Sequence, residues 1–66
     1  MKVNFNGKEI DVNSDIVLTG LLALENVPSV GVAVAINGKV VRKAEWESTH
    51  LKENDNILVI SAVCGG

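Results

Sequence analysis

The chain has 66 residues, of which 47% are hydrophobic and 3% aromatic, and a formal net charge of −2. A domain of this size buries about 60% of the surface that its unfolded chain exposes, which leaves no room for a deep substrate pocket beside a core. The acidic balance and the lack of a basic cluster argue against nucleic-acid binding. Size, composition and charge therefore favour one small carrier or binding domain over an independent enzyme.

The single cysteine, Cys64, cannot form an internal disulfide, which argues against a secreted scaffold held together by disulfides. No apolar stretch approaches the roughly 20 residues of a membrane-spanning helix, and the chain shows no signal-peptide pattern. We therefore expect a cytoplasmic protein that binds neither membranes nor nucleic acids.

The first predicted elements form a β-hairpin. Residues 2–5 and 8–12 alternate polar and apolar side chains, and this period of two is typical of half-buried strands. Asn6 and Gly7 lie between them, and Asn-Gly is the preferred pair for a tight type I′ turn because both positions need a positive φ.

A helix is expected next. Asn13, Ser14 and Asp15 are residue types that cap helix N-termini, and apolar residues with helical spacing follow them. This stripe comprises Leu18, Leu21 and Leu22, with Glu25 at its polar end. Pro28 cannot continue a helix and restricts Val27 before it, so the helix is predicted to end before this proline.

Two strands in the second half, over residues 31–36 and 57–63, are apolar on both faces, and such strands are usually central in a sheet. A second Asn-Gly pair, Asn37 and Gly38, follows the first of them and leads into a short return strand over residues 39–42. The second half therefore predicts another hairpin and a separate C-terminal strand.

The polar connection over residues 43–56 contains two large apolar side chains, Trp46 and Leu51, which are expected to pin it to the core. Tryptophan is enriched in binding hot spots, but in a domain with two aromatic residues the burial of the ring favours a core position for Trp46. The run Asn54-Asp55-Asn56 is typical of a turn.

Together these elements predict an α+β fold of the β-grasp (ubiquitin-like) type, a mixed sheet with one main helix packed on one face. The last strand would lie beside the first and parallel to it. We predict a β-grasp domain over residues 1–62 and a flexible C-terminal tail over residues 63–66. The face without the helix would be an uncovered apolar surface, which suggests a protein contact. The residues predicted for it are Val32, Val34, Val59 and Ser61, with the outward parity of the last strand left open.

The terminal pair Gly65-Gly66 is the strongest functional signal. Glycine has no Cβ, so Gly65 lets the tail enter a narrow slot, and the open carboxylate of Gly66 becomes an acyl donor once it is activated. At an average glycine content of roughly 7%, chance gives two terminal glycines in about 0.5% of chains. Cys64 lies two residues from that carboxylate and could attack it when activated, although an unreactive small apolar cysteine is the favoured interpretation.

A set of residues spread over the whole chain has the spacing of a known family. The set comprises Ile36-Asn37-Gly38, Arg42, Trp46, Asp55, Val59 and the terminal Gly65-Gly66. With it the chain resembles the ThiS family, the small sulfur carriers of bacterial thiamine biosynthesis. The terminal glycines are shared by all ubiquitin-like carriers, whereas the Asn-Gly turn, Arg42 and Trp46 favour ThiS among them.

The resemblance implies a carrier that is not itself an enzyme and binds no cofactor or metal. A ThiF-like adenylyltransferase would use ATP to convert the Gly66 carboxylate to an acyl-adenylate. Sulfur from the persulfide of a cysteine desulfurase would then replace AMP, leaving a thiocarboxylate for a ThiG-like thiazole synthase. By the same resemblance Gly66 is the reactive site and Gly65 gives the tail clearance.

Other functions share parts of this pattern. The small subunit of molybdopterin synthase, or another ubiquitin-like sulfur carrier, has the same tail and activation but a different acceptor. A protein modifier would end in an isopeptide bond to lysine. A non-reactive β-grasp adaptor would carry the terminal glycines by chance.

The remaining polar residues give no sign of a second site. His50 has no second His, Cys or carboxylate at a metal-ligand spacing, so a solvated loop position is favoured. Asp11 and Asp15 have no basic or nucleophilic partner and are interpreted as turn and cap residues. Glu45 and Glu47 are expected to face water.

Overall fold

The computed structural model describes residues 1–28 and 30–61. Its elements follow the predicted order of two strands, a helix, two strands and a final strand, with an additional 3₁₀-helix that the sequence did not predict. They are β1 (Lys2–Phe5), β2 (Lys8–Asp11), α1 (Leu18–Leu24), β3 (Val32–Ile36), β4 (Lys39–Val41), the 3₁₀-helix η1 (Lys43–Ser48) and β5 (Asn56–Ser61). Neither helix in the described ranges has the length and apolar character needed to cross a membrane.

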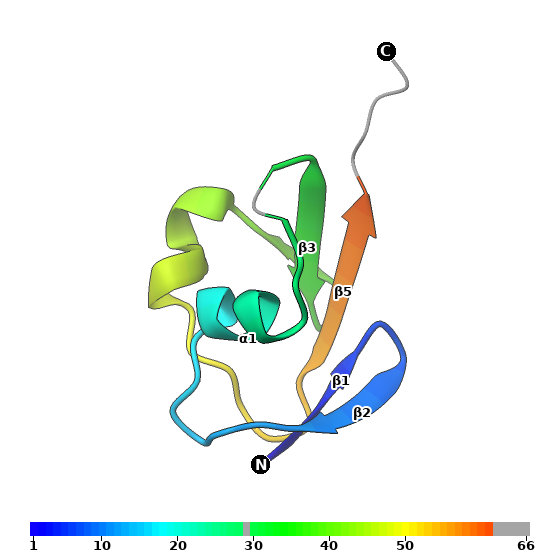
Figure 1. The fold of residues 1–66 in the computed structure, drawn as a ribbon, viewed down its shortest axis with the longest axis vertical. Coiled ribbons are helices and arrows are strands. Elements are labelled where there is room, and N and C mark those ends of the chain that lie inside the picture. The colour runs from blue at the N-terminus through cyan, green and yellow to red at the C-terminus, as the bar shows by residue number, and fades with distance from the viewer. Residues whose placement is uncertain (29, 62–66) are drawn as a thin grey trace.

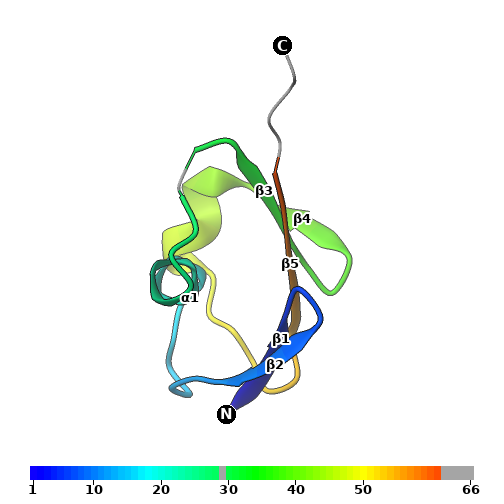
Figure 2. The same cartoon turned by 45° about the vertical axis from the view of Figure 1, so that its right-hand side comes forward.

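The five strands form one sheet in the order β2-β1-β5-β3-β4 (Figure 1). The C-terminal strand β5 lies at its centre, parallel to β1 and antiparallel to β3. α1 and η1 lie on the same side of the sheet (Figure 2). The predicted β-grasp arrangement, a mixed sheet with one main helix on one face, is confirmed.

The core lies between the sheet and the two helical elements. Its buried members are Val3, Phe5, Val12, Leu18, Leu21, Leu22, Val34, Trp46, Leu51 and Ile57. Trp46 and Leu51 both belong to it, so the prediction that they anchor the connection after β4 is confirmed. The indole Nε1 of Trp46 donates to the carbonyl of Val41 at 3.0 Å, which satisfies the polar atom of the buried ring.

The start of α1 differs from the prediction. The N-cap is Val17, and in the described part of the chain no side chain caps this helix end. Residues 13–15 instead form a turn, in which the N–H of Ile16 donates to the carbonyl of Asn13 at 3.2 Å. The physical reason is a tertiary partner: the N–H of Leu18 donates to the carbonyl of Thr49 at 2.8 Å, so a free N–H group of the first turn is satisfied without a cap.

The end of α1 is set by Asn26, two residues before the proline. Asn26 has a φ of 57°, and its N–H donates to the carbonyl of Ala23 at 3.2 Å. The next N–H, of Val27, donates to the carbonyl of Leu22 at 2.9 Å. This is the Schellman arrangement, with asparagine in the position that glycine usually takes. Pro28 therefore follows a helix that has already ended.

Both Asn-Gly pairs form the predicted turns. The φ angles are 51° at Asn6 and 83° at Gly7, and they are 53° at Asn37 and 87° at Gly38. These are the positive values that a type I′ turn needs. Each turn also contacts β5, at a different point along that strand.

Asp55 organises the loop that leads into β5. Its buried carboxylate accepts a hydrogen bond from Nδ2 of Asn37 at 2.9 Å and another from the N–H of Lys52 at 2.8 Å. Asn54 has a φ of 68°, whereas Asn56 already belongs to β5. The turn lies earlier than predicted: the N–H of Asp55 donates to the carbonyl of Lys52 at 3.0 Å, so Glu53 and Asn54 are its central residues. Asp55 follows them as a buried hydrogen-bond acceptor just before the central strand.

Candidate functional site

The predicted reactive end follows β5 in the chain. Gly65 and Gly66 lie outside the described residues, as do Cys64 and the predicted boundary between domain and tail. The structure describes β5 as far as Ser61. The side chains on and around β5 are therefore the part of the candidate site that the structure describes.

Exposed apolar side chains lie along β5 on the sheet face that points away from α1. Leu58 and Ile60 are 46% and 53% exposed, and Val40 on β4 is 74% exposed. Leu58 is opposite Ala35, which is itself opposite Val40, and directly opposite residues share one face of a sheet. Val40, Leu58 and Ile60 form what we term the apolar patch. The prediction of an uncovered apolar face is confirmed.

The residues predicted for that face are the wrong set. Val34 is buried, and Val32 and Val59 are half-buried against the core. Ser61 is opposite Val32 and shares its face, so all four lie on the side that α1 covers. A shift of one residue along a strand reverses the face, and a strand that is apolar on both sides gives no sequence signal of its parity.

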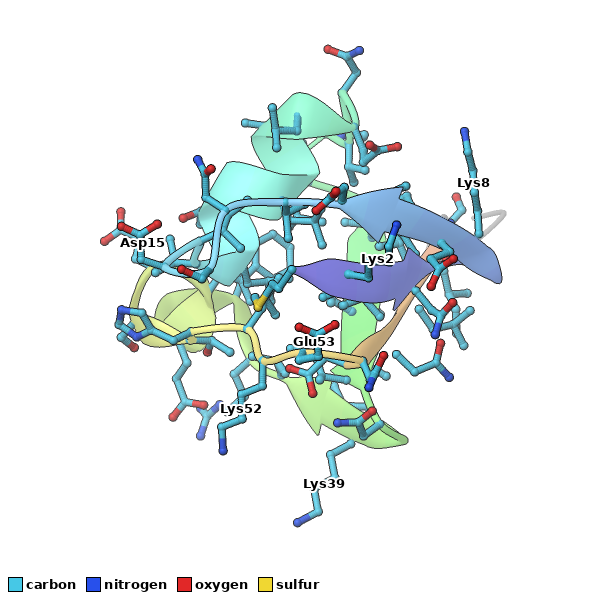
Figure 3. All side chains as sticks on the ribbon, turned by 90° about the horizontal axis from the view of Figure 1, so that it is seen from below. Lys2, Lys8, Asp15, Lys39, Lys52 and Glu53 are labelled. Carbon is cyan, nitrogen blue, oxygen red and sulfur yellow. The ribbon has the colours of Figure 1, made fainter. Side chains whose placement is uncertain are left out.

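Charged side chains do not gather into a reactive cluster. Figure 3 shows Lys8, Asp15 and Lys39 projecting from separate parts of the molecule. Across residues 1–28 and 30–61, no group of three His, Cys, Asp or Glu side chains is placed to hold a metal ion. Asp15 belongs to the turn before α1 and not to its cap.

The other polar residues discussed from the sequence lie at the surface. His50 is exposed, and its backbone pairs with that of Val17. Glu45 and Glu47 are exposed, which confirms that they face water. Asp11 accepts a hydrogen bond from the N-terminal ammonium group at 3.3 Å. These contacts are structural and offer no acid-base pair.

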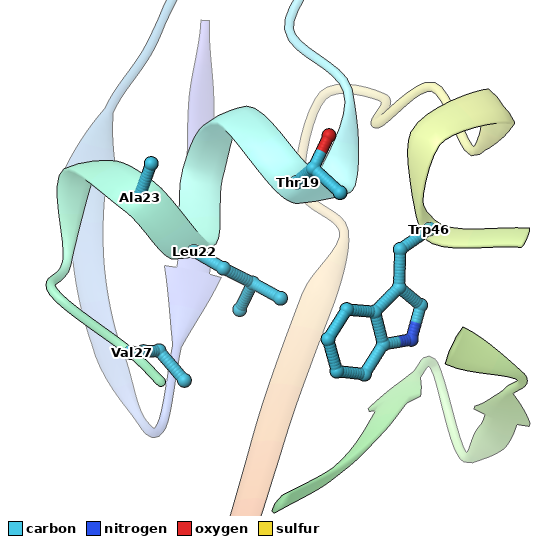
Figure 4. Close-up of a pocket in the computed structure, with 5 residues that line it drawn as sticks. All are labelled: Thr19, Leu22, Ala23, Val27 and Trp46. Carbon is cyan, nitrogen blue, oxygen red and sulfur yellow. The ribbon is translucent and has the colours of Figure 1, made fainter. Parts of the chain in front are cut away.

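A small apolar cavity lies on the helix side of the molecule (Figure 4). It is lined by Thr19, Leu22, Ala23, Val27 and Trp46. Its volume of about 190 Å³ is below the roughly 300–1,000 Å³ of typical ligand pockets. The lining has no carboxylate, imidazole or thiol. We therefore interpret the cavity as a gap in the packing between α1 and η1, and not as a catalytic site.

One contact of β5 was not predicted from the sequence. The N–H of Val59 donates to the side-chain Oδ1 of Asn6 at 2.8 Å. The Asn-Gly pattern predicted the turn, but the partner of the asparagine side chain depends on which strand the fold places beside that turn. No local sequence signal carries this information.

Comparisons with known proteins agree with the fold and with the expected family. A family model described as the ThiS family matches residues 2–66. Among solved structures, the chain is similar to a crystal structure of the thiamine biosynthesis protein ThiS from Geobacter metallireducens. The two share 28% sequence identity over 100% of both chains, with a TM-score of 0.86.

A second similar structure is the NMR solution structure of a thiamine biosynthesis protein from the same organism. It has 28% identity and a TM-score of 0.78, and the match covers 100% of this chain and 88% of that one. No curated protein sequence has a significant match to the chain. The similarity therefore rests on the family model and on structures of the same five-stranded fold.

Proposed function

The chain belongs to the ThiS family, and on this premise we propose that it is a sulfur carrier for the biosynthesis of the thiazole part of thiamine. In this proposal the carboxylate of Gly66 is converted to a thiocarboxylate that donates its sulfur to a thiazole synthase. Gly65 keeps the tail narrow enough for the active sites of partner enzymes. The observation that carries the proposal is the family match over residues 2–66, which includes both terminal glycines.

The chemistry requires an activating enzyme because a carboxylate is a poor electrophile. In the proposed first step a carboxylate oxygen of Gly66 attacks the α-phosphorus of ATP on a ThiF-like adenylyltransferase, and pyrophosphate leaves. Hydrosulfide then attacks the acyl carbon; where the nucleophile is instead a persulfide formed by a cysteine desulfurase, a thiol reductant cleaves the resulting acyl disulfide and releases the thiocarboxylate. The C–S bond forms, the C–O bond to AMP breaks, and AMP leaves with its electron pair. The carrier acts in the cytoplasm as a co-substrate and binds no cofactor of its own.

The apolar patch is the proposed docking surface for the ThiF-like enzyme and, afterwards, for the ThiG-like synthase. Leu58 and Ile60 belong to the strand that leads directly into the C-terminal segment. A partner that covers these side chains therefore holds the chain within a few residues of Gly66. The Leu58 and Ile60 side chains are about half exposed in the free chain, so covering them contributes favourable burial of apolar surface.

The test is intact mass spectrometry of the chain after incubation with a ThiF-like enzyme, ATP and sodium sulfide. We expect a mass gain equal to the replacement of one oxygen by sulfur, and no gain in a variant that lacks Gly66. The second control is a variant with one alanine added after Gly66. It should also show no mass gain, because its last residue carries a Cβ that the narrow slot would not admit. An unchanged mass with an enzyme that converts its own carrier would contradict the proposal, and the adaptor function would then be favoured.

The identity of the enzyme that accepts the sulfur is tested separately, by isothermal titration calorimetry. We expect the chain to bind a thiazole synthase and not the large subunit of a molybdopterin synthase. The reverse preference would retain the sulfur-carrier mechanism and reassign the pathway.

A further inference from the structure

The pairing of β5 with β1 ends before β5 does. Within this parallel pair, Asn4 is opposite Asn56 and Phe5 is opposite Ile57, and β1 then ends at Phe5. On its other side β5 stays paired with β3 as far as Ser61. The second half of β5 therefore passes the turn between β1 and β2, and within residues 1–28 and 30–61 it pairs with a strand on the β3 side only.

Asn6 completes this ladder with its side chain. In a parallel ladder a residue donates with its N–H and accepts with its carbonyl from the same neighbouring strand. The N–H of Asn6 donates to the carbonyl of Ile57 at 2.8 Å, and the N–H of Val59 donates to Oδ1 of Asn6 at 2.8 Å. Because Asn6 adopts a φ of 51° in the turn, its backbone leaves the strand conformation. The side-chain carbonyl supplies the acceptor at Val59 instead.

This contact lies on the strand segment that carries the docking surface, ahead of the reactive end in the chain. Val59 is flanked by Leu58 and Ile60 of the apolar patch, and it precedes Gly66 by seven residues. We propose that Asn6 is a positioning residue, which fixes the backbone of β5 at Val59 and thereby directs the segment that bears Gly66 into the activating enzyme. This inference rests on the proposed sulfur-carrier function.

The choice of residue at this turn position supports a role beyond the turn itself. Glycine, asparagine and aspartate all adopt a positive φ with little strain. Glycine would serve the turn equally well, but it has no side-chain acceptor for the N–H of Val59. Asparagine and aspartate provide both the turn geometry and the acceptor, so Asn6→Gly and Asn6→Asp separate the two roles.

The experiment compares Asn6→Gly, Asn6→Asp and Asn37→Gly, the last being the same substitution in the other Asn-Gly turn. Amide hydrogen exchange at Val59, followed by NMR, reports the contact without any enzyme. Steady-state kinetics of thiocarboxylate formation, with a ThiF-like enzyme, ATP and sulfide, reports positioning through kcat and docking through KM. Both are measured at a temperature where every variant is folded.

We expect the Val59 amide of Asn6→Gly to exchange about tenfold faster and kcat to fall about three- to tenfold, the range that the loss of one hydrogen bond predicts. KM should stay unchanged because the apolar patch is intact. Asn6→Asp should keep both the Val59 exchange rate and kcat at their wild-type values, because aspartate retains the side-chain acceptor. Asn37→Gly should retain the wild-type kcat, although it removes two side-chain hydrogen bonds, those with Asp55 and Asn56.

Three results would overturn the proposal. The first is a wild-type kcat in Asn6→Gly, and the second is unchanged exchange at Val59. The third is an equal loss of kcat in Asn6→Gly and Asn37→Gly, which would mean that general stability governs the rate. A wild-type chain that is never converted would instead refute the sulfur-carrier function, and the positioning role would fall with it.

Discussion

The two Asn-Gly turns have the same sequence and the same signs of φ, yet they hold different parts of β5 in different surroundings. At the start of β5, the N–H of Asn37 donates to the carbonyl of Asn56 at 2.8 Å, and Oδ1 of Asn37 accepts from the N–H of Asn56 at 2.9 Å. The Nδ2 of Asn37 also reaches the buried carboxylate of Asp55. Farther along the strand, Asn6 makes the corresponding backbone and side-chain contacts with Ile57 and Val59. The side-chain contact of each turn with β5 is exposed, and the part-buried bond to Asp55 is made by Asn37.

The difference indicates that one turn stabilises the fold and the other orients a functional segment. Asn37 donates to Oδ1 of the buried Asp55 carboxylate, whereas Lys52 donates to Oδ2. Loss of the Asn37 donor leaves Oδ1 without this partner, at a cost of about 1–3 kcal/mol. At an exposed position such as the contact of Asn6 with Val59, water replaces a lost partner at little cost. The start of β5 should therefore control stability, and its later half should control presentation of the tail.

The largest expected effect follows from the burial of Ile57, which is 0% exposed near the start of β5. Ile57→Ala should lower the free energy of unfolding by about 2–5 kcal/mol, because the smaller side chain leaves a cavity in the core. Leu58→Ala, at the adjacent position on the open face, should cost less than about 1 kcal/mol. Urea titration followed by fluorescence of the single tryptophan, Trp46, measures both.

Ile57→Val is a milder control and should cost about 0.5–1.5 kcal/mol. Equal losses for Ile57→Ala and Leu58→Ala would show that the parity of β5 is not the one described. Leu58 would then contribute to the core as much as Ile57 does.

The next effect concerns function at the far end of the strand. Ile60→Lys should leave the fold intact but lower kcat/KM for thiocarboxylate formation about thirtyfold, the effect of losing a hot-spot contact of about 2 kcal/mol. Leu24→Lys is the matched control, because Leu24 is also an exposed apolar residue, at 62%, but lies in α1. Steady-state kinetics with the activating enzyme measures both, and circular dichroism verifies the fold.

If both lysine variants lost activity equally, a general change in charge would explain the loss and the apolar patch would not be the docking surface. If neither lost activity, the activating enzyme would dock elsewhere on the chain. Either outcome would mean that the later half of β5 has no specific role in docking the activating enzyme.

Sequence patterns were sufficient where the local chain decides the structure. The two Asn-Gly turns, the alternating first strands and the burial of Trp46 and Leu51 were all predicted correctly, because each depends on residue type and nearby spacing. The central position of β5 was also predicted, since its apolar character requires neighbours on both sides.

The failures arose where a distant segment decides the structure. The cap predicted at residues 13–15 is absent because Thr49 satisfies the first helical N–H. The parity of β5 could not be read from a strand that is apolar on both faces. The side-chain contacts of Asn6 and Asn37 depend on the strand that the fold places beside each turn. The roles of Gly65 and Gly66 in the functional proposal rest on the sequence and on the family match.

The smallest effect tests the contrast most directly, because the same substitution is made in both turns. Asn37→Gly keeps the positive φ but removes the donor to Asp55 and the acceptor for the N–H of Asn56. It should lower the free energy of unfolding by about 1–3 kcal/mol. Asn6→Gly removes one exposed hydrogen bond and should cost less than about 1 kcal/mol. Urea titration of the two variants measures the difference. A loss for Asn6→Gly as large as that for Asn37→Gly would mean that both turns stabilise the fold alike, and no separate role would be left for the turn that contains Asn6.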